Sequence, residues 1–170
     1  MKEIKAIFSD VDGVLTDGRL FIDGDGEEVL KVFDVKDGMG IKLAQKYGIV
    51  FGVISGRGCK ALEARMEDLQ VEEVHLKIKD KLNLLKGILE KYKIQPEECL
   101  YIGDDLNDIE IGSFLMEQGG WFAAPSDAVL RVRESANYLC ESAGGRGAVR
   151  EVVDRVIEEK KITSTYLDRN

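Results

Sequence analysis

The sequence has few cysteine and histidine residues, the residue types that form disulfides and most zinc sites. Its 170 residues include three cysteines, Cys59, Cys99 and Cys140, and a single histidine, His75. The wide cysteine spacing offers no Cys-x-x-Cys pair and no Cys/His cluster, which disfavours a zinc site or a disulfide framework. We therefore expect three reduced thiols. We expect a structural role for His75, because no second histidine is present as a metal or relay partner.

Positive charge and long apolar runs are also scarce. Lys and Arg number 24 against 32 Asp and Glu, which gives a formal net charge of -8. Nucleic-acid backbones and anionic membrane surfaces attract basic faces, so this balance disfavours both partners. No apolar run approaches the ~18 residues of a membrane span, and the N-terminus lacks signal-peptide architecture. We expect a cytoplasmic protein with no nucleic-acid or membrane partner.

Strand-like segments alternate with helical patterns along the chain. Strands are expected at residues 4–9, 49–54, 71–76, 99–102, 121–123 and 136–140, and helices at 37–47, 59–69, 81–92, 105–118 and 146–161. Gly24-Asp25-Gly26 predicts a β-hairpin over about 19–34, and 162–170 is expected to be a tail. The alternation predicts an α/β fold, a doubly wound parallel sheet in a single domain, residues 1–170. Ligands of such sheets bind beyond the carboxyl ends of the strands.

Two acidic residues, Asp10 and Asp12, follow the first predicted strand. At a spacing of two, their side chains project to the same side of an extended backbone. Carboxylates and carbonyls are ligands for a hard divalent cation. One carboxylate can attack phosphorus, and the other can protonate the leaving oxygen and then activate water. The alternative is a plain turn or a calcium loop, but the twelfth position of such a loop would be Phe21 in place of Glu.

Three further groups follow or precede later predicted elements. Ser55 ends a strand, where it could donate to a phosphate oxygen or simply cap the next helix. Lys81 opens a helix and could screen the charge between a phosphate and a nucleophilic carboxylate, although a lysine there is usually solvent-exposed. Asp104, Asp105 and Asp108 cluster at a strand-to-helix junction. Helix capping explains the presence of one of these three carboxylates. Clustered carboxylates repel one another unless a cation neutralises them, so a metal site explains the cluster better.

The order of these motifs resembles the haloacid dehalogenase superfamily of phosphotransferases. The motifs that carry the resemblance are Asp10-x-Asp12, Ser55, Lys81 and Asp104-Asp105-x-x-Asp108. The resemblance implies the Rossmann-like haloacid dehalogenase fold. It also implies that Ser55 and Lys81 hold the phosphoryl group.

The same resemblance implies a magnesium site. In it, Asp10 is the nucleophile and a Mg²⁺ ligand, and Asp12 is the general acid/base that binds Mg²⁺ through its carbonyl. Asp104 completes the protein ligands. Asp105 and Asp108 are implied to act behind these ligands or through water.

The segments between the motifs are too short for a cap domain, which most members of that superfamily carry. Between Asp12 and Ser55 the chain has only the hairpin and one helix, and between Ser55 and Lys81 it has one helix and one strand. We therefore expect an enzyme without a cap, whose site is closed by a neighbouring subunit.

A closer resemblance is to the 3-deoxy-D-manno-octulosonate 8-phosphate phosphatase family, carried by residues 12–18, the hairpin, and residues 33–41 and 144–151. It implies Mg²⁺-dependent hydrolysis of that acid sugar phosphate to the free sugar and phosphate, in lipopolysaccharide precursor synthesis. It also implies a homotetramer in which hairpins line the neighbouring site. The implied substrate contacts are Asp12, Phe33, Asp34, Val35, Lys36, Asp37, Ile41, Arg57, Arg65 and Lys81.

Arg57 bears on the choice of sugar. In a sister family that acts on a nine-carbon acid sugar 9-phosphate, a Glu is usual at this place, whereas Arg can pair bidentately with a substrate carboxylate. The nine-carbon substrate is the first alternative. A phospho-receiver domain is a second, although it would carry its Asp after a middle strand, and intact motifs disfavour a catalytically idle subunit. The family's Gln-Gly pair before the motif lysine is replaced here within residues 75–80, which changes the expected pocket wall beside Lys81.

Overall fold

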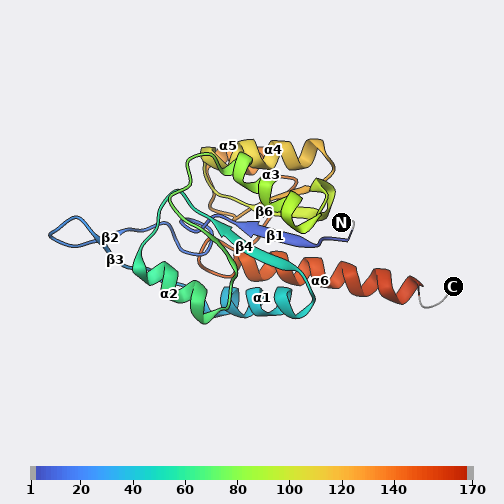
Figure 1. Ribbon diagram of the computed structural model, residues 1–170, viewed down its shortest axis with the longest axis horizontal. Coiled ribbons are helices and arrows are strands. Elements are labelled where there is room, and N and C mark those ends of the chain that lie inside the picture. The colour runs from blue at the N-terminus through green and yellow to red at the C-terminus, as the bar shows by residue number, and fades with distance from the viewer. Residues whose placement is uncertain (1–2, 168–170) are drawn as a thin grey trace.

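The computed structural model describes residues 3–167, and in these a six-stranded sheet lies between two layers of helices (Figure 1). The strands are β1 (Ala6–Ser9), β4 (Val50–Ile54), β5 (Glu73–His75), β6 (Cys99–Ile102), β7 (Trp121–Ala124) and β8 (Tyr138–Leu139). Their order is β5-β4-β1-β6-β7-β8, and every neighbouring pair is parallel. The predicted doubly wound α/β fold is confirmed.

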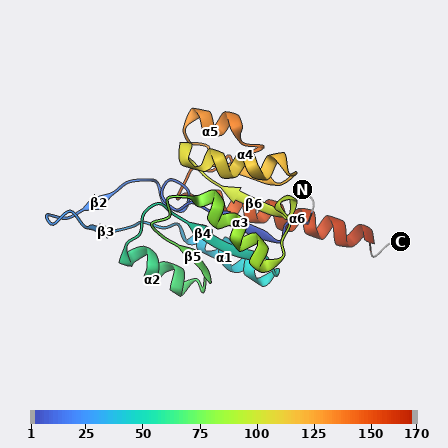
Figure 2. The same ribbon diagram turned by 45° about the horizontal axis from the view of Figure 1, so that its top comes forward.

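The helices divide between the two faces of the sheet. One face carries α3 (Lys81–Tyr92), α4 (Ile109–Glu117) and α5 (Leu130–Ser135), and the other carries α1 (Val35–Lys46), α2 (Lys60–Asp68) and α6 (Ala148–Leu167). The two layers remain on opposite sides of the sheet when the molecule is turned (Figure 2). No helix in the described part of the chain combines the length and the apolar character needed to cross a membrane.

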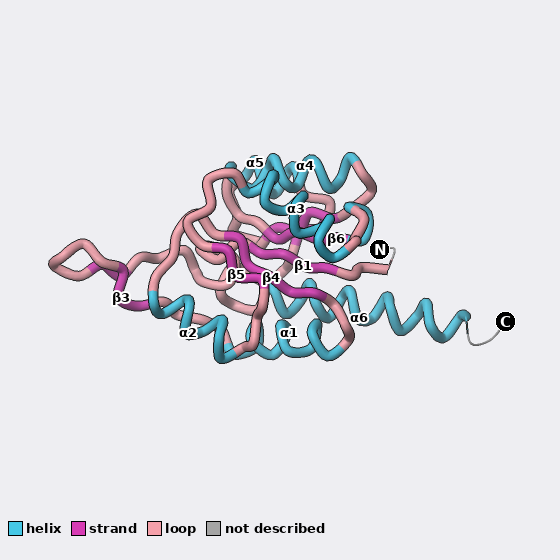
Figure 3. The backbone as a smooth tube through the Cα atoms, in the orientation of Figure 1, coloured by secondary structure: helices cyan, strands magenta, loops and turns pink. Residues whose placement is uncertain are grey.

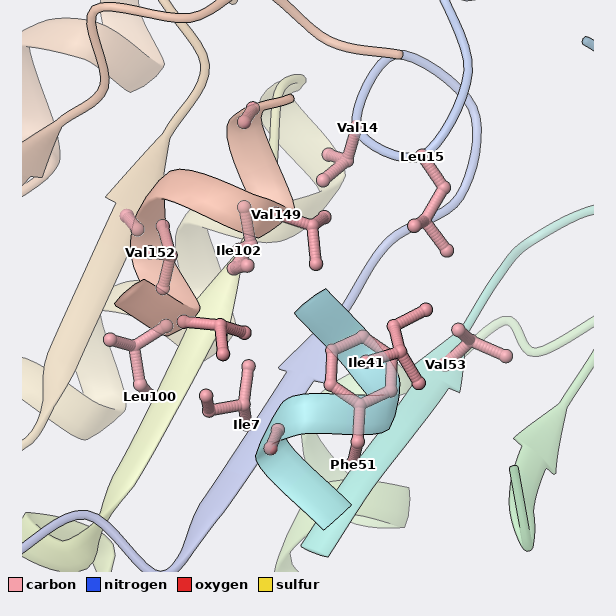
Figure 4. Close-up of a cluster of buried hydrophobic side chains, with 14 of the residues drawn as sticks. Ile7, Val14, Leu15, Ile41, Phe51, Val53, Leu100, Ile102, Val149 and Val152 are labelled. Atoms are coloured by element: carbon pink, nitrogen blue, oxygen red, sulfur yellow. The ribbon is translucent and has the colours of Figure 1, made fainter. Parts of the chain in front are cut away.

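Alternation along the central strands divides the core into two clusters. Ile7 and Ile102 are buried among residues of α1 and α6 (Figure 4). Phe8 and Tyr101, one position away, are buried among residues of α3 and α4. Because both faces of these strands are covered, they are apolar at nearly every position. Fully burying each large side chain contributes roughly 1.5–3 kcal/mol, so the two clusters hold the sheet rigid beneath the site.

A two-stranded antiparallel hairpin, β2 (Phe21–Ile22) and β3 (Glu28–Leu30), interrupts the β/α order as predicted. It projects from the body of the molecule at the end where β1 and β4 finish (Figure 3). The chain leaves β1, forms the hairpin and returns to the sheet edge to begin α1. The hairpin base is therefore held beside the carboxyl ends of the strands.

Two local predictions need correction, and one short helix was missed. The helix expected at 105–118 begins as a 3-10 turn, Leu106–Asp108, because the side chains of Asp105 and Asp108 cap each other's backbone N–H groups. The short helix α5 was not predicted, since six residues carry too little periodicity. The expected tail at 162–170 is wrong through Leu167, where α6 continues, and residues 168–170 lie outside the described chain.

Candidate active site

Asp10 lies directly beyond β1, the strand from which the sheet is built outward in both directions. Its neighbours β4 and β6 belong to opposite halves of the doubly wound sheet, so Asp10 lies at the topological switch point. The residue is only 6% exposed. Lys81 Nζ donates to Asp10 Oδ2 at 2.7 Å, and the backbone N–H of Val11 donates to Oδ1 at 2.7 Å.

Lys81 joins Asp10 to a second buried carboxylate. Its ammonium group also donates to Asp108 Oδ1 at 2.8 Å, and the hydroxyl of Tyr101 donates to the same oxygen at 2.8 Å. Lys81 is the first residue of α3, and Asp80 caps that helix by accepting from the N–H of Asn83. The helix start therefore positions the lysine. The solvent-exposed alternative for Lys81 does not hold, because the residue is only 5% exposed.

Three carboxylates meet at this point. Asp10, Asp104 and Asp108 each present an oxygen such that all three atoms lie within 4.8 Å of one another. Asp104 Oδ1 is buried and has no hydrogen-bond partner. Gly13, with a φ of +83°, passes so close that a Cβ there would lie 2.0 Å from Asp104 Oδ2. The chain thus leaves room for the Asp104 carboxylate at the centre of the site.

The electrostatics of the cluster disfavour ionisation of Asp10 and Asp104. Burial, and then the charge of Asp108, raises the pKa of Asp10 to about 6, against the opposing effect of Lys81. Burial, followed by the charges of Asp10, Asp108 and Asp105, raises the pKa of Asp104 to about 8. A divalent cation would offset this repulsion, and carboxylate oxygens are the ligands that Mg²⁺ prefers. The unpartnered buried oxygen of Asp104 and the oxygen-only donor set therefore fit a Mg²⁺ ion.

Asp12 follows Asp10 by two residues and pairs with two cations. Lys31 Nζ contacts Asp12 Oδ1, and Arg57 Nε lies 4.0 Å from Asp12 Oδ2. The same two cations also reach Glu28, with Lys31 Nζ 2.6 Å from Oε1 and Arg57 Nη2 3.7 Å from Oε2. Sequence reasoning missed Lys31 and Glu28. The available signal was a pair of charges three residues apart within the apolar second half of the hairpin.

Ser55 follows β4 and is 1% exposed. Its hydroxyl oxygen accepts the backbone N–H of Arg57 at 3.1 Å, which leaves the hydroxyl hydrogen available for another acceptor. Arg57 itself is exposed, with half of its side chain open to solvent. The structure therefore brings Asp10, Asp12, Ser55 and Lys81 to one edge of the sheet, together with Asp104 and Asp108.

Asp105 and Asp108 have structural contacts as well. Asp105 is exposed, and its carboxylate accepts the backbone N–H of Leu106 at 2.7 Å. Asp108 is fully buried, and its Oδ2 accepts the N–H of Asp104 at 3.1 Å. Asp108 thus lies behind Asp104 and orients the loop that carries it.

Two expected substrate contacts have structural roles in this chain. Ile41 is 0% exposed and belongs to the core cluster under α1 (Figure 4). Asp37 is 1% exposed, and its carboxylate accepts the backbone N–H groups of Gly147 at 3.1 Å and Arg150 at 2.9 Å. Asp37 therefore caps the start of α6. Neither side chain is available to a ligand here, because both are buried. The sequence alone could not predict this, since the contacts that bury them come from distant parts of the chain.

The other expected contacts lie around the start of α1 and on α2. Phe33 packs partly buried against the core, and Asp34 caps α1 by accepting the N–H of Lys36 at 2.7 Å. Val35 is 78% exposed, and Lys36 is also exposed. On α2, Arg65 Nη1 donates to Asp68 Oδ2 at 2.7 Å. The geometry shows no contact between these residues and the carboxylate cluster.

His75 has a partner on its own strand. Its Nε2 lies 2.7 Å from Glu73 Oε2. This hydrogen bond is compatible with the structural role expected for the single histidine.

Comparison with known proteins identifies the family of the chain. Residues 72–152 match the family model of haloacid dehalogenase-like hydrolases. The chain is 40% identical over 156 residues to the 3-deoxy-D-manno-octulosonate 8-phosphate phosphatase of Escherichia coli. The aligned residues cover 92% of this chain and 80% of that protein.

Solved structures agree with this match. The 3-deoxy-D-manno-octulosonate 8-phosphate phosphatase of Yersinia pestis has a TM-score of 0.85 at 38% identity, covering 91% of this chain and 80% of that one. The enzyme of Moraxella catarrhalis, solved in complex with a magnesium ion, a phosphate ion and a KDO molecule, has a TM-score of 0.86 at 30% identity, covering 98% and 92%. The chain therefore belongs to the 3-deoxy-D-manno-octulosonate 8-phosphate phosphatase family of haloacid dehalogenase-like hydrolases.

Proposed function

We propose that this protein hydrolyses 3-deoxy-D-manno-octulosonate 8-phosphate to the free sugar and phosphate, in the cytoplasm, during lipopolysaccharide precursor synthesis. The observation that carries the proposal is the buried nucleophile position of Asp10, paired to Lys81 at 2.7 Å and adjoining Asp104 at the switch point of the sheet. The family membership supplies the substrate.

The reaction divides between Asp10 and Asp12. A carboxylate oxygen of Asp10 attacks phosphorus, the bond to the sugar oxygen breaks, and Asp12 gives that oxygen a proton. Asp12 then takes a proton from water, which attacks the aspartyl-phosphate, and Asp10 leaves as a carboxylate. Lys81 and Ser55 donate to the phosphoryl oxygens and screen their charge from Asp10.

A Mg²⁺ ion would be held by the carboxylates of Asp10 and Asp104 and by the carbonyl of Asp12. When bound, it neutralises charge between the nucleophile and the phosphoryl oxygens. Asp108 orients Asp104 through the backbone N–H bond described above. Asp105 acts at a further remove, through the turn that it caps.

Arg57 is the proposed contact for the sugar carboxylate. Its side chain is half exposed at the rim of the site, and a guanidinium can bind a carboxylate with two parallel hydrogen bonds. Arg65 and the segment 33–36 are proposed to contact the rest of the sugar. Arg57, at the place where the sister family usually has a Glu, is the reason to favour the eight-carbon sugar over the nine-carbon alternative.

We propose that the site is completed by a homotetramer, with the hairpin in place of a cap domain. Large apolar side chains are exposed on and beside the hairpin. They are Leu20, Phe21, Ile22, Val29, Leu30, Val32, Val35 and Met39. A patch of this kind marks a contact with another protein surface. Light scattering over a dilution series is expected to give four times the chain mass, and a monomer mass would overturn this proposal.

A substrate panel tests the activity. Phosphate release is measured from the eight-carbon 8-phosphate and the nine-carbon 9-phosphate, each with Mg²⁺ and with chelator. We expect a higher kcat/KM for the eight-carbon substrate and loss of activity with chelator. No release from the eight-carbon substrate would overturn the proposed function. Faster turnover of the nine-carbon substrate would establish the alternative.

A further inference from the structure

Lys31, at the base of the hairpin, is buried against the proposed general acid/base. Its side chain is 1% exposed, although it belongs to a segment whose neighbours Leu30 and Val32 face solvent. Its ammonium group contacts Asp12 Oδ1 and lies 2.6 Å from Glu28 Oε1. A buried lysine is costly unless it is paired, and here both of its partners are carboxylates.

The contact makes the two oxygens of Asp12 different. Oδ1 is held by Lys31, whereas Oδ2 is buried and has no hydrogen-bond partner. Arg57 Nε, at 4.0 Å from Oδ2, lies beyond hydrogen-bond distance. The Asp12 carboxylate is therefore anchored through Oδ1, while Oδ2 makes no hydrogen bond within the described residues.

The surrounding charges balance. Lys31 and Arg57 oppose Asp12 and Glu28, and both cations reach both carboxylates. The side chain of Glu28 is only 6% exposed, and its Oε1, which has no hydrogen bond within the described residues, is an ion-pair partner of the ammonium group. The strand segment thus has a polar inner side directed at Asp12 and an apolar outer side. Lys31 is therefore held in place independently of any ligand.

We propose that Lys31 is a positioning residue, which anchors Asp12 through Oδ1 and so orients this carboxylate for proton transfer to the oxygen leaving phosphorus. The inference rests on the proposed role of Asp12. It adds a contribution of the hairpin to the chemistry of its own chain. Removing Lys31 should therefore impair proton delivery to the leaving group more than it impairs attack by Asp10.

The test compares two aryl phosphates that differ in their need for that proton. p-Nitrophenolate leaves readily as an anion, whereas the more basic phenolate gains more from protonation. The value of kcat/KM reports the half-reaction up to release of the aryl group. We expect Lys31→Met to lower kcat/KM for phenyl phosphate about 100-fold and for p-nitrophenyl phosphate less than about tenfold, since general acid catalysis contributes about 10²–10⁴-fold.

Matched variants separate positioning from folding. Lys31→Arg keeps a cation and is expected to recover most of the phenyl phosphate activity. Lys42→Met removes an exposed lysine from α1 and should leave both values unchanged. Thermal unfolding checks each variant, and Lys31→Gln replaces Lys31→Met if the latter does not fold.

Two outcomes overturn the proposal. These are an equal loss on both esters, which is the result of a purely structural role, and no loss on either. The aryl esters contain no sugar, so this result is independent of the substrate panel. Failure of the wild-type protein on the octulosonate would overturn the proposed function alone.

Discussion

Two carboxylates, Glu73 on β5 and Asp104 just beyond β6, have pKa values displaced in opposite directions from that of an ordinary acid. Glu73 is 4% exposed. Its oxygens lie 2.5 Å from Lys91 Nζ, 2.6 Å from the hydroxyl of Tyr92 and 2.7 Å from His75 Nε2. Although burial disfavours the charge, these bonds together lower the pKa of Glu73 to about 2. The pKa of Asp104 is raised to about 8.

The difference separates a structural carboxylate from a functional one. Glu73 finds its partners within the chain, so its charge stabilises the edge strand β5. Asp104 faces two further carboxylates, so its charge costs stability in the folded chain. Acids whose pKa values are strongly shifted by burial and by neighbouring charges of the same sign are typical of sites that act on a ligand. The two carboxylates should therefore respond differently to substitution. Four predictions follow this contrast, two on Asp104 and Glu73 themselves, one on Asp10 in the same cluster as Asp104, and one on Asp37, which like Glu73 has its partners within the chain.

The largest effect is expected from Asp10→Asn. An amide cannot form the aspartyl-phosphate, so phosphate release should fall at least about 10⁴-fold, as when a catalytic nucleophile is removed. The melting temperature should be unchanged or higher, because the substitution removes a charge from a repelling cluster. Colorimetric phosphate assays and calorimetry measure the two effects. Activity close to wild type would mean that Asp10 is not the nucleophile.

Asp104→Asn should remove the stabilisation of the protein by Mg²⁺. A ligand at 100 times its Kd stabilises the folded state by about 2.7 kcal/mol, which corresponds to a rise of about 5 to 10 °C in melting temperature. Calorimetry with Mg²⁺ or with chelator measures this rise. We expect it in the wild-type protein and its absence in the variant. Equal rises in both would show that Asp104 does not bind the ion.

Glu73→Gln should destabilise the fold and spare the activity. Loss of charge-assisted bonds to a buried carboxylate costs about 1–3 kcal/mol. The folded-state pKa of about 2 lies below the ordinary 4.5, so the wild-type advantage is present above pH 4.5 and is lost as the pH falls toward 2. Urea unfolding at pH 7 and pH 4 should show a smaller difference between variant and wild type at pH 4. A difference that does not change with pH would contradict this account.

Asp37→Asn should give the smallest effect. An amide has one acceptor oxygen for the two N–H groups of Gly147 and Arg150, so the cap of α6 weakens by about 1 kcal/mol. The KM for the sugar phosphate should stay at the wild-type value, because the side chain is 1% exposed. Steady-state kinetics and thermal unfolding decide the point. A raised KM with an unchanged melting temperature would restore Asp37 as a substrate contact.

Much of the fold could be predicted because it is local. The strands alternate with helices, and hydrophobic patterning distinguishes them over five to ten residues. The site residues Asp10, Ser55 and Asp104 could be placed at strand ends, since parallel strands bring their carboxyl ends to one edge. The helix boundaries near Asp105 and Leu167 could not be predicted. Side-chain capping decides the first, and residues of weak helix propensity decide the second.

Sequence by itself determined the order of the elements and the chemical groups at the strand ends, because both follow from periodicity and short motifs. Tertiary structure decided which of these groups meet. It assigned Ile41 to the core and Asp37 to the start of α6. It also brought Lys31 onto Asp12 across 19 positions of the chain. The contact of Lys31 depends on how the hairpin folds back onto the sheet, and that of Asp37 depends on how α1 packs against α6. No local pattern of residues encodes either geometry.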